Sequence, residues 1–309
     1  MPHNPFGNPL FLPSLGRVLA LIVLGVAGVM LAQRRPLRVL RRSTFFSRAR
    51  TWLWLGPLFL VCAFTQGFVA FGLAAYVTIH GLSEFVRLAG VQRRYALLLV
   101  VGSLLGLLVA ALARSYFLFL PFAFFILLTL VPIVGGDVEG SGRQVGDTLF
   151  GYLYIGLPLA YIVFVKAAEP WGLNFIVLVT VAVAVSDIAA YAVGVALKGP
   201  KLIPRVDPDK TWSGALGNLL GAAVGVGLLW NVVPHARWDP AAVVVLVVMI
   251  GVGSMWGDVT EAFVKRAFRV EAASTFLVGF GGVLDRVDSL LMAFPLAYYA
   301  VRLTLQLTT

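Results

Sequence analysis

Repeated apolar runs of about 20 residues constrain the fold of this chain more than any other feature. Hydrophobic side chains make up 60% of its 309 residues and charged side chains only 12%, and the mean hydropathy is +0.93. A soluble domain carries roughly a quarter charged residues, so this composition excludes one. The runs lack the period-two alternation of a β-barrel. We therefore predict an all-α fold, a polytopic transmembrane helical bundle.

Ten apolar segments can be drawn, although the second and third are short and form either a hairpin or one long helix. The segments are approximately 15–32, 51–65, 67–81, 95–113, 115–134, 147–167, 173–194, 214–233, 240–257 and 282–302. With ten segments, the loops on one side hold seven, three, one, four and three Lys and Arg residues, and the other side holds few. Because basic residues collect in cytoplasmic loops, we favour the hairpin and place these loops inside. The expected count is nine or ten spanning segments in a bacterial inner membrane.

A net charge of +10 can indicate nucleic-acid binding or basic cytoplasmic loops that face anionic lipid. In a membrane protein, the second explanation is the better one. No DNA- or RNA-binding module is visible, so we expect no nucleic-acid partner. The basic stretch 33–50 is either a topological anchor or an amphipathic surface helix that gathers anionic lipid. The single cysteine, Cys62, lies in an apolar run and provides neither a disulfide nor a zinc site.

Acidic residues recur beside the inner ends of three apolar segments. Asp187 lies within segment 173–194, Asp258 follows segment 240–257, and Asp285 and Asp288 open segment 282–302. Charge beside hydrocarbon is costly, so ionisable groups there are functional candidates. Separate parts of the chain thus bring acids to one membrane depth. The alternative for Asp187 is a polar contact within the bundle.

Asp285 and Asp288 are three residues apart, so on a helix they share a face. Two such carboxylates repel each other unless a cation or a basic group lies between them. Oxygen ligands suit Mg²⁺, and we predict Asp258, Asp285 and Asp288 as its ligands. Gly281 and Gly282 precede the helix and leave its N–H groups open to an anion. The alternative is a helix cap by Asp285 with a local salt bridge from Arg286.

Basic residues close to these acids are suited to phosphate binding. Lys201 and Lys210 lie in a proline-rich loop, and Lys265 and Arg266 follow the acids of segment 240–257. Charge-assisted hydrogen bonds from such a loop could hold triphosphate oxygens. The alternative is that the loop cations are ordinary inside-positive residues. The three histidines lie away from these clusters, which argues against a histidine base.

These motifs resemble those of the phosphatidate cytidylyltransferase family (CDP-diacylglycerol synthases). Residues 257–266 read GDVTEAFVKR, and residues 279–290 read GFGGVLDRVDSL, close to the family's GD-x-TES-x-x-KR and PGHGG-x-LDR-x-D. Upstream, Asp187 and the residues from Lys201 to Gly214, with Lys210-Thr211-Trp212, match D-x-x-AY-x-x-G and K-L-x-P-x-x-SP-x-KTW-x-G. The likeness covers roughly 48–305. We therefore divide the chain into an extra N-terminal helix and basic segment, 1–47, and a cytidylyltransferase-like membrane domain, 48–309.

The resemblance implies transfer of CMP from CTP to phosphatidate, with Mg²⁺, giving CDP-diacylglycerol and pyrophosphate. It implies catalytic roles for Asp258, Asp285, Arg286 and Asp288. The residues expected to bind the nucleotide and its cation are Lys201, Lys210, Thr211, Asp187, Lys265, Arg266, Gly281 and Gly282. The expected partners are CTP, a lipid phosphate and the bilayer, and a homodimer is left open.

Five positions depart from the family pattern. Glu271 and Ala272 replace a Lys-Asp pair, Val278 and Phe280 replace a proline and a histidine, and Ala262 replaces a serine. Two alternatives therefore stay open beside the cytidylyltransferase. One is a CTP-dependent lipid-alcohol kinase, and the other is a catalytically weak paralogue that binds lipid or a partner protein.

Overall fold

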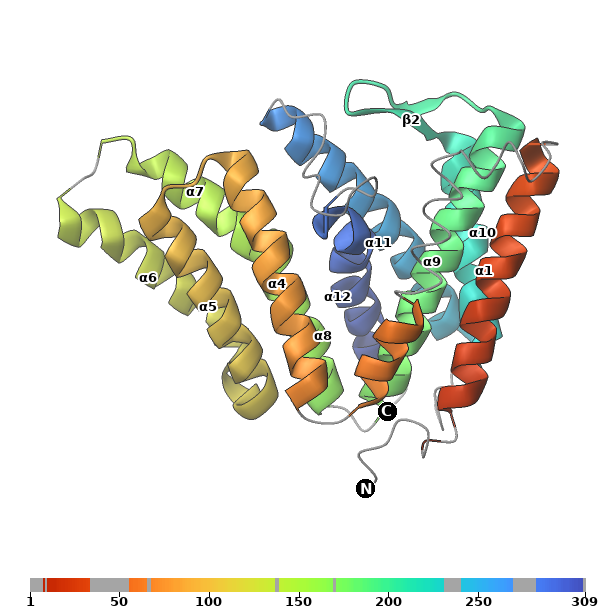
Figure 1. Ribbon diagram of the computed structural model, residues 1–309, viewed down its shortest axis with the longest axis horizontal. Coiled ribbons are helices and arrows are strands. Elements are labelled where there is room, and N and C mark those ends of the chain that lie inside the picture. Colours follow the sequence, from red (N-terminus) through yellow and green to blue (C-terminus); the bar gives the residue numbers. More distant parts are fainter. Residues whose placement is uncertain are drawn as a thin grey trace.

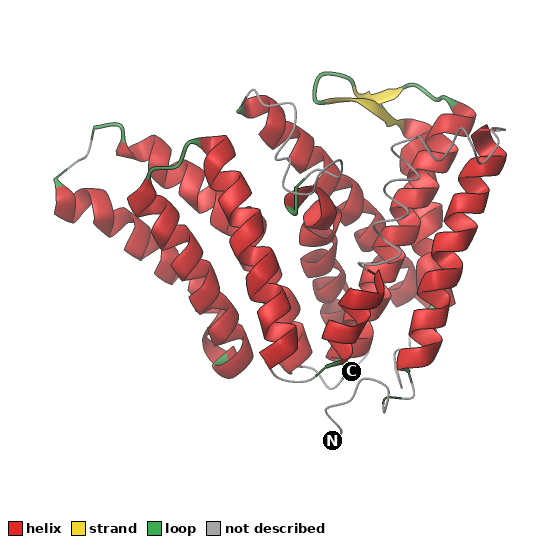
Figure 2. Ribbon diagram, in the orientation of Figure 1, coloured by secondary structure: helices red, strands yellow, loops and turns green. Residues whose placement is uncertain are grey.

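The computed structural model describes residues 8, 10–33, 56–65, 68–136, 139–168, 171–230, 240–268 and 282–307. Helices make up almost all of this part of the chain, and they stand side by side (Figures 1 and 2). The all-α membrane fold is thereby confirmed. Among the described residues, six helices are long and apolar enough to cross a membrane. They are Val69–Ala89, Arg93–Leu112, Arg114–Gly135, Ser141–Ala167, Gly172–Leu197 and Pro240–Ala267.

The described elements follow one another along the chain in the order given below. The first half contains α1 (Phe11–Gln33), a short helix over 56–64, α4 (Phe68–Ala89), α5 (Arg93–Leu112), η2 (Arg114–Phe119), α6 (Leu120–Gly135) and α7 (Ser141–Gly151). The second half contains the π-helical turn η3 (Tyr152–Gly156), α8 (Leu157–Ala168), α9 (Gly172–Leu197), β1 (Lys201–Ile203), β2 (Asp207–Thr211), α10 (Trp212–Leu228), α11 (Pro240–Ala267) and α12 (Leu284–Leu307). The boundary predicted at residue 47 lies outside the described residues.

The short helix over 56–64 and α4 are two separate helices, as we expected from the charge pattern. The Lys166 ammonium of α8 donates to the carbonyl oxygens of Ala63 (2.7 Å) and Thr65 (3.1 Å). The last carbonyls of a helix lack partners within it, and a lysine that binds them stabilises the helix end. The short helix therefore ends at Phe64, before the bend at Thr65, and is separate from α4.

Glycines at four-residue intervals bring α9 and α10 into close contact. A Cβ atom added at Gly221 would lie 2.7 Å from Ser186 Cα, and one at Gly225 would lie 2.5 Å from Ala182 Cα. Both distances are shorter than real Cβ contacts, so only glycine permits this approach. Between membrane helices, where lipid is as apolar as leucine, such close backbone packing is a main source of association.

Two elements depart from the predicted boundaries. Helix α11 continues to Ala267, so the first residues of the predicted inner loop 258–281 are helical. The predicted loop 195–213 contains an antiparallel hairpin in which Lys201 pairs with Thr211. Both regions lie at the upper end of the molecule in Figure 1, together with the α4–α5 connection and the start of α7. The structure thus places the described parts of four predicted inner loops at one end of the bundle.

Candidate active site

The acidic residues of α11 lie on one face of that helix. Asp258, Glu261 and Lys265 are spaced by three and four residues, which puts them on the same side. Asp258 lies nine residues before the helix end, about 14 Å along the axis. The sequence analysis placed these residues in a loop beyond a helix ending near 257, which is wrong. The charges are instead recessed within a spanning helix, where carboxylates need partners.

Asp258 joins the hairpin to the two C-terminal helices. The Lys210 ammonium of β2 forms an ion pair with one carboxylate oxygen of Asp258, and the hydroxyl of Ser289 on α12 donates to the other. The side chains of Lys210 and Asp258 are 29% and 22% exposed. Burial lowers the pKa of Lys210, but Asp258, with help from Asp187, raises it by more. The net pKa is above the ordinary value, so this lysine stays charged at neutral pH.

Lys265 joins α11 to the start of α12. Its ammonium lies 2.8 Å from a Glu261 oxygen and 3.1 Å from an Asp285 oxygen. The other Asp285 oxygen accepts a hydrogen bond from the backbone N–H of Gly282 (3.1 Å). Asp288, one turn farther along α12, is 8% exposed. We call Lys210, Asp258, Glu261, Lys265, Asp285 and Asp288 the charged cluster.

Close contact between α11 and α12 holds the two halves of the charged cluster together. A Cβ atom at Gly253 would lie 2.5 Å from Ala293 Cα, and one at Gly257 would lie 2.7 Å from Ser289 Cα. Gly257 immediately precedes Asp258. Its lack of a side chain therefore lets Ser289 reach the Asp258 carboxylate.

The position of α12 depends on an acid that is distant in the sequence. Glu84 of α4 is 1% exposed, and its carboxylate accepts hydrogen bonds from the N–H groups of Val283 (2.8 Å) and Leu284 (2.9 Å). The first N–H groups of a helix have no partner within it, and a carboxylate there also meets the positive end of the helix dipole. Glu84 is thus a positioning residue for Asp285 and Asp288.

We expect Glu84→Gln to lower the thermal stability of the purified protein and its activity together. An amide keeps only one acceptor oxygen and brings an NH₂ group against a backbone N–H, so one charge-assisted bond is lost and one donor is left unpaired. The free energy of unfolding should fall by about 2–3 kcal/mol. Glu139→Gln, at an exposed residue, is the matched control. Equal melting temperatures for both variants in detergent would contradict this role.

Asp187 meets the charged cluster through a buried polar network. The Ser254 hydroxyl of α11 donates to Asp187 (2.6 Å), and the Asn218 amide of α10 donates to Ser254 (3.2 Å). Asp187 interacts electrostatically with Asp258, Asp288 and Lys210. Three helices therefore contribute to one polar region beside the cluster.

The chemistry of these donors fits a hard cation. All the candidate ligands are carboxylate oxygens, the type that Mg²⁺ prefers. Within the described parts of the chain, however, no three acidic, histidine or cysteine side chains come together as a ready-made metal site. Asp258 and Asp285 are each paired with a lysine. This set is suited to a cation held by one or two carboxylates and by substrate phosphates, which is how Mg²⁺ is commonly bound.

Comparison with known proteins places this arrangement in a family. The model of the cytidylyltransferase family matches residues 46–304, most of the chain. This chain belongs to the cytidylyltransferase family. A Brucella suis protein named phosphatidate cytidylyltransferase is 37% identical over 253 residues, which cover 80% of this chain and 86% of that protein. A Bacillus subtilis protein of the same name is 29% identical over 182 residues, 59% of this chain and 66% of that protein.

A third relative extends through the N-terminal region. The uncharacterized protein YnbB of Escherichia coli is 26% identical over 296 residues, which cover 94% of this chain and 97% of that protein. The family assignment confirms the resemblance drawn from the sequence motifs. The chain is therefore a membrane enzyme of the nucleotidyltransferase class.

Six of the site residues predicted for this cytidylyltransferase meet in space. They are Asp187, Lys210, Asp258, Lys265, Asp285 and Asp288. Arg286 lies half-buried on α12 between the last two acids. Their chemical roles stay predictions.

Three other predicted residues have contacts in the hairpin region, and their nucleotide-binding roles stay predictions. Lys201 is exposed on β1, where it pairs with Thr211 of β2. Arg266 is exposed, and its side chain donates to the Val206 carbonyl, which braces the hairpin. The Thr211 hydroxyl accepts a bond from the Gly214 N–H (3.1 Å) and so caps α10. Gly281 and the departures at 271, 272 and 280 lie outside the described residues, whereas Gly282 contacts both Asp285 and Glu84.

Several residues of this cytidylyltransferase site were not predicted from the sequence, among them Ser254 and Ser289. Glu84 is another, and its presence as an acid in an apolar segment was the available signal. A further one is Tyr154 of η3, whose ring packs in an apolar cluster with Val264, Leu284 and Leu291. Its hydroxyl is buried without a hydrogen-bond partner among the described residues. It lies near four carboxyl groups of the charged cluster.

Proposed function

We propose that this chain is an integral membrane phosphatidate cytidylyltransferase, which converts CTP and phosphatidate into CDP-diacylglycerol and pyrophosphate. The observation that carries the proposal is the meeting of Lys210 and Lys265 with acids of α9, α11 and α12, of which α9 and α11 are long and apolar enough to span a membrane. Two lysines can neutralise phosphates, and the acids can hold a cation between those phosphates. The names of the relatives support phosphatidate as the acceptor.

In the reaction, an oxygen of the lipid phosphate attacks the α-phosphorus of CTP. A new P–O bond forms, the bond to the β-phosphate oxygen breaks, and pyrophosphate leaves. A phosphate monoester is already nucleophilic at neutral pH, so no strong general base is needed. The protein must mainly align two anions and neutralise the charge of the transition state. Lys210 is placed for this task because Asp258 keeps it charged, and Lys265 is placed across the cluster from it.

A divalent cation, held by Asp258, Asp285 or Asp288 with substrate oxygens, would supply further charge neutralisation at the phosphates. We further propose that the charged end of the bundle faces the cytoplasm of a bacterial inner membrane. The basic residues of the predicted inner loops support this orientation, because CTP is a cytosolic nucleotide. A homodimer stays a prediction.

The departures from the family motifs favour one other candidate, a catalytically weak lipid-binding paralogue. Glu271 places a negative charge where the family has a positive one, and Phe280 replaces a histidine. Like charge near a triphosphate would weaken its binding.

Purified protein should be incubated with CTP, Mg²⁺ and phosphatidate, and assayed for pyrophosphate and lipid-linked CMP. We expect both products in equal amounts, and we expect a chelator to abolish them and added Mg²⁺ to restore them. Release of CDP with a diacylglycerol or polyprenol acceptor would instead identify a lipid-alcohol kinase. Binding of phosphatidate without turnover in protein of native melting temperature would identify the paralogue.

Replacing Tyr154 by phenylalanine should lower turnover about 10- to 100-fold, the value of a hydrogen bond to a charged group, without lowering stability. Its hydroxyl has no partner in the described free protein, so its removal costs no bond there, but it can donate to a substrate phosphate near the carboxyl groups. Tyr95→Phe is the control, since that hydroxyl is also buried and unpartnered among the described residues. Full activity of the Tyr154→Phe enzyme would disprove the contact.

A further inference from the structure

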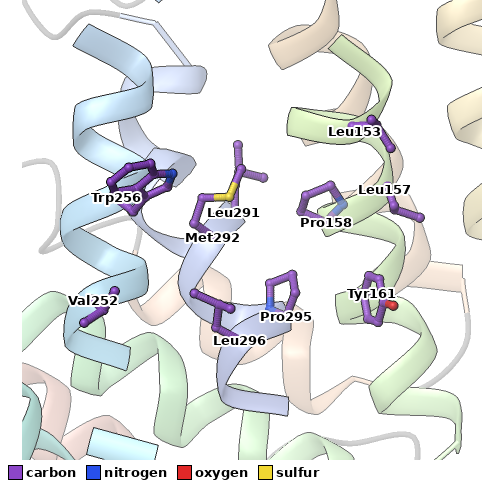
Figure 3. Close-up of a pocket in the computed structure, with 10 residues that line it drawn as sticks. All are labelled: Leu153, Leu157, Pro158, Tyr161, Val252, Trp256, Leu291, Met292, Pro295 and Leu296. Atoms are coloured by element: carbon purple, nitrogen blue, oxygen red, sulfur yellow. The ribbon is translucent and has the colours of Figure 1, made fainter. Parts of the chain in front are cut away.

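An apolar groove lies between the helix formed by η3 and α8 and the pair α11 and α12. Its volume is about 460 Å³ (Figure 3). Leu153 and Leu157 form one wall, and Trp256 and Met292 form the other. This volume lies within the range of small-molecule sites, roughly 300–1,000 Å³. The groove is therefore large enough to hold an organic ligand.

The groove borders the hydrocarbon of the bilayer. Both α8 and α11 belong to segments long and apolar enough to cross a membrane. On these segments Leu153 is 43% exposed, Val252 is 39% exposed and Trp256 is 59% exposed. Side chains exposed on the face of a spanning helix contact lipid, so an apolar ligand can enter sideways from the membrane.

The groove lies next to the charged cluster along α12. Leu291 and Met292, which line the groove, follow Asp288 by three and four residues, so they lie on the same face of α12, about one turn or 5.4 Å along the helix. Leu291 also packs in the same apolar cluster as Tyr154. A molecule with an anionic head at the cluster and an apolar chain attached to it therefore matches both surfaces.

We infer that this groove binds one acyl chain of the lipid phosphate substrate. This inference rests on the proposed function. The chain comes from a bilayer that is itself apolar, so the groove gains little affinity from its burial. Its contribution is orientation: a chain seated between α8 and α12 aligns the attached phosphate with the charged cluster. Misplacement of a reacting group by about 1 Å can cost roughly 100-fold in rate.

The test is to fill the end of the groove that lies farther from Asp258. Val252 lies one turn before Trp256 on α11, so a larger side chain there should block a long acyl chain but leave room for a short one. We expect Val252→Trp to lower kcat/KM for dioleoyl phosphatidate about tenfold or more, and for dihexanoyl phosphatidate less than about twofold. Val101→Trp, at a residue of α5 that is 43% exposed, should change neither.

Equal losses on both substrates, or no loss on the long one, would overturn the inference. If the wild-type enzyme turns over neither substrate, the proposed function fails instead. A second measurement uses the unmodified protein, in case Val252→Trp does not fold. Phosphatidate with a photoreactive group at the chain end should label peptides containing residues 252–256 and 291–296. Labelling elsewhere, or equal labelling of these peptides by a photoreactive phosphatidylcholine, would show that the groove does not select the substrate chain.

Discussion

Asp258→Asn is expected to lower turnover about a thousandfold, a loss of about 4 kcal/mol in transition-state stabilisation. Asp258 is the one described carboxylate that contacts both the hairpin, through Lys210, and α12, through Ser289. Asparagine has a similar shape. Its one carbonyl oxygen can accept from Lys210, and its NH₂ group can donate to the Ser289 hydroxyl, so the fold should survive. What disappears is the negative charge that holds Lys210 and, in our proposal, the cation.

The matched control is Asp147→Asn. The Asp147 side chain is also 22% exposed and also faces a basic residue, Arg143 at 3.5 Å, but it lies on α7 outside the charged cluster. Such a pair on one helix contributes about 0.3–0.5 kcal/mol, so activity should stay within about twofold. Initial rates of pyrophosphate release, with melting temperatures as a check on folding, measure the difference. Wild-type turnover by the Asp258→Asn enzyme would remove Asp258 from the mechanism.

Gly257→Ala should be the most damaging single-methyl change in α11. The added Cβ would lie 2.7 Å from Ser289 Cα and also collide with the backbone oxygen of Asp288. Backbone atoms cannot rotate away as a flexible side chain can, so α11 and α12 must separate. Overpacking of this kind costs about 1–3 kcal/mol. Activity should fall more than about tenfold, because the shift separates Ser289 from Asp258.

Gly72→Ala is the control for Gly257→Ala. It adds the same methyl group, but at a position where we expect no loss of stability. Gly72 is exposed on α4, and a Cβ there meets nothing within 4 Å. Alanine favours a helix over glycine by about 1 kcal/mol, so the melting temperature should stay equal or rise. Melting in detergent and turnover, measured for both variants, test the argument. Equal stability of the two variants would mean that α11 and α12 are not held by this close contact.

The sequence pointed to the acids that meet in the charged region but not to the partners that hold them there. Asp187, Asp258, Asp285 and Asp288 were recognisable because a carboxylate in an apolar segment is rare without a purpose. Thr211 and Arg266 were predicted to bind the nucleotide, and that role stays a prediction; in the structure Thr211 caps α10 and Arg266 braces the hairpin. A threonine or arginine beside a helix end has several local uses, and only the neighbouring backbone decides among them.

The length of α11 shows a second limit. Its apolar run ends near residue 257, and we ended the helix there, but the helix continues through charged residues to Ala267. Hydropathy reports where a segment contacts lipid. Helical hydrogen bonds continue wherever the next residues permit them. The spacing of Asp258, Glu261 and Lys265 already fitted one helical face, and it was the better signal.

By itself the sequence determined the all-α membrane fold, the family and the candidate carboxylates. These follow from local properties: a long apolar run must satisfy its backbone hydrogen bonds internally, and a motif keeps its residue types and spacing. Only the tertiary structure decided that Glu84 anchors α12 across about 200 residues of chain, and that Lys210 pairs with Asp258. It also decided that an apolar groove, lined by Met292, lies about one helical turn from Asp288 of the charged cluster. Such pairings depend on how closely helices approach, which here is set by glycines meeting particular backbone atoms of another helix.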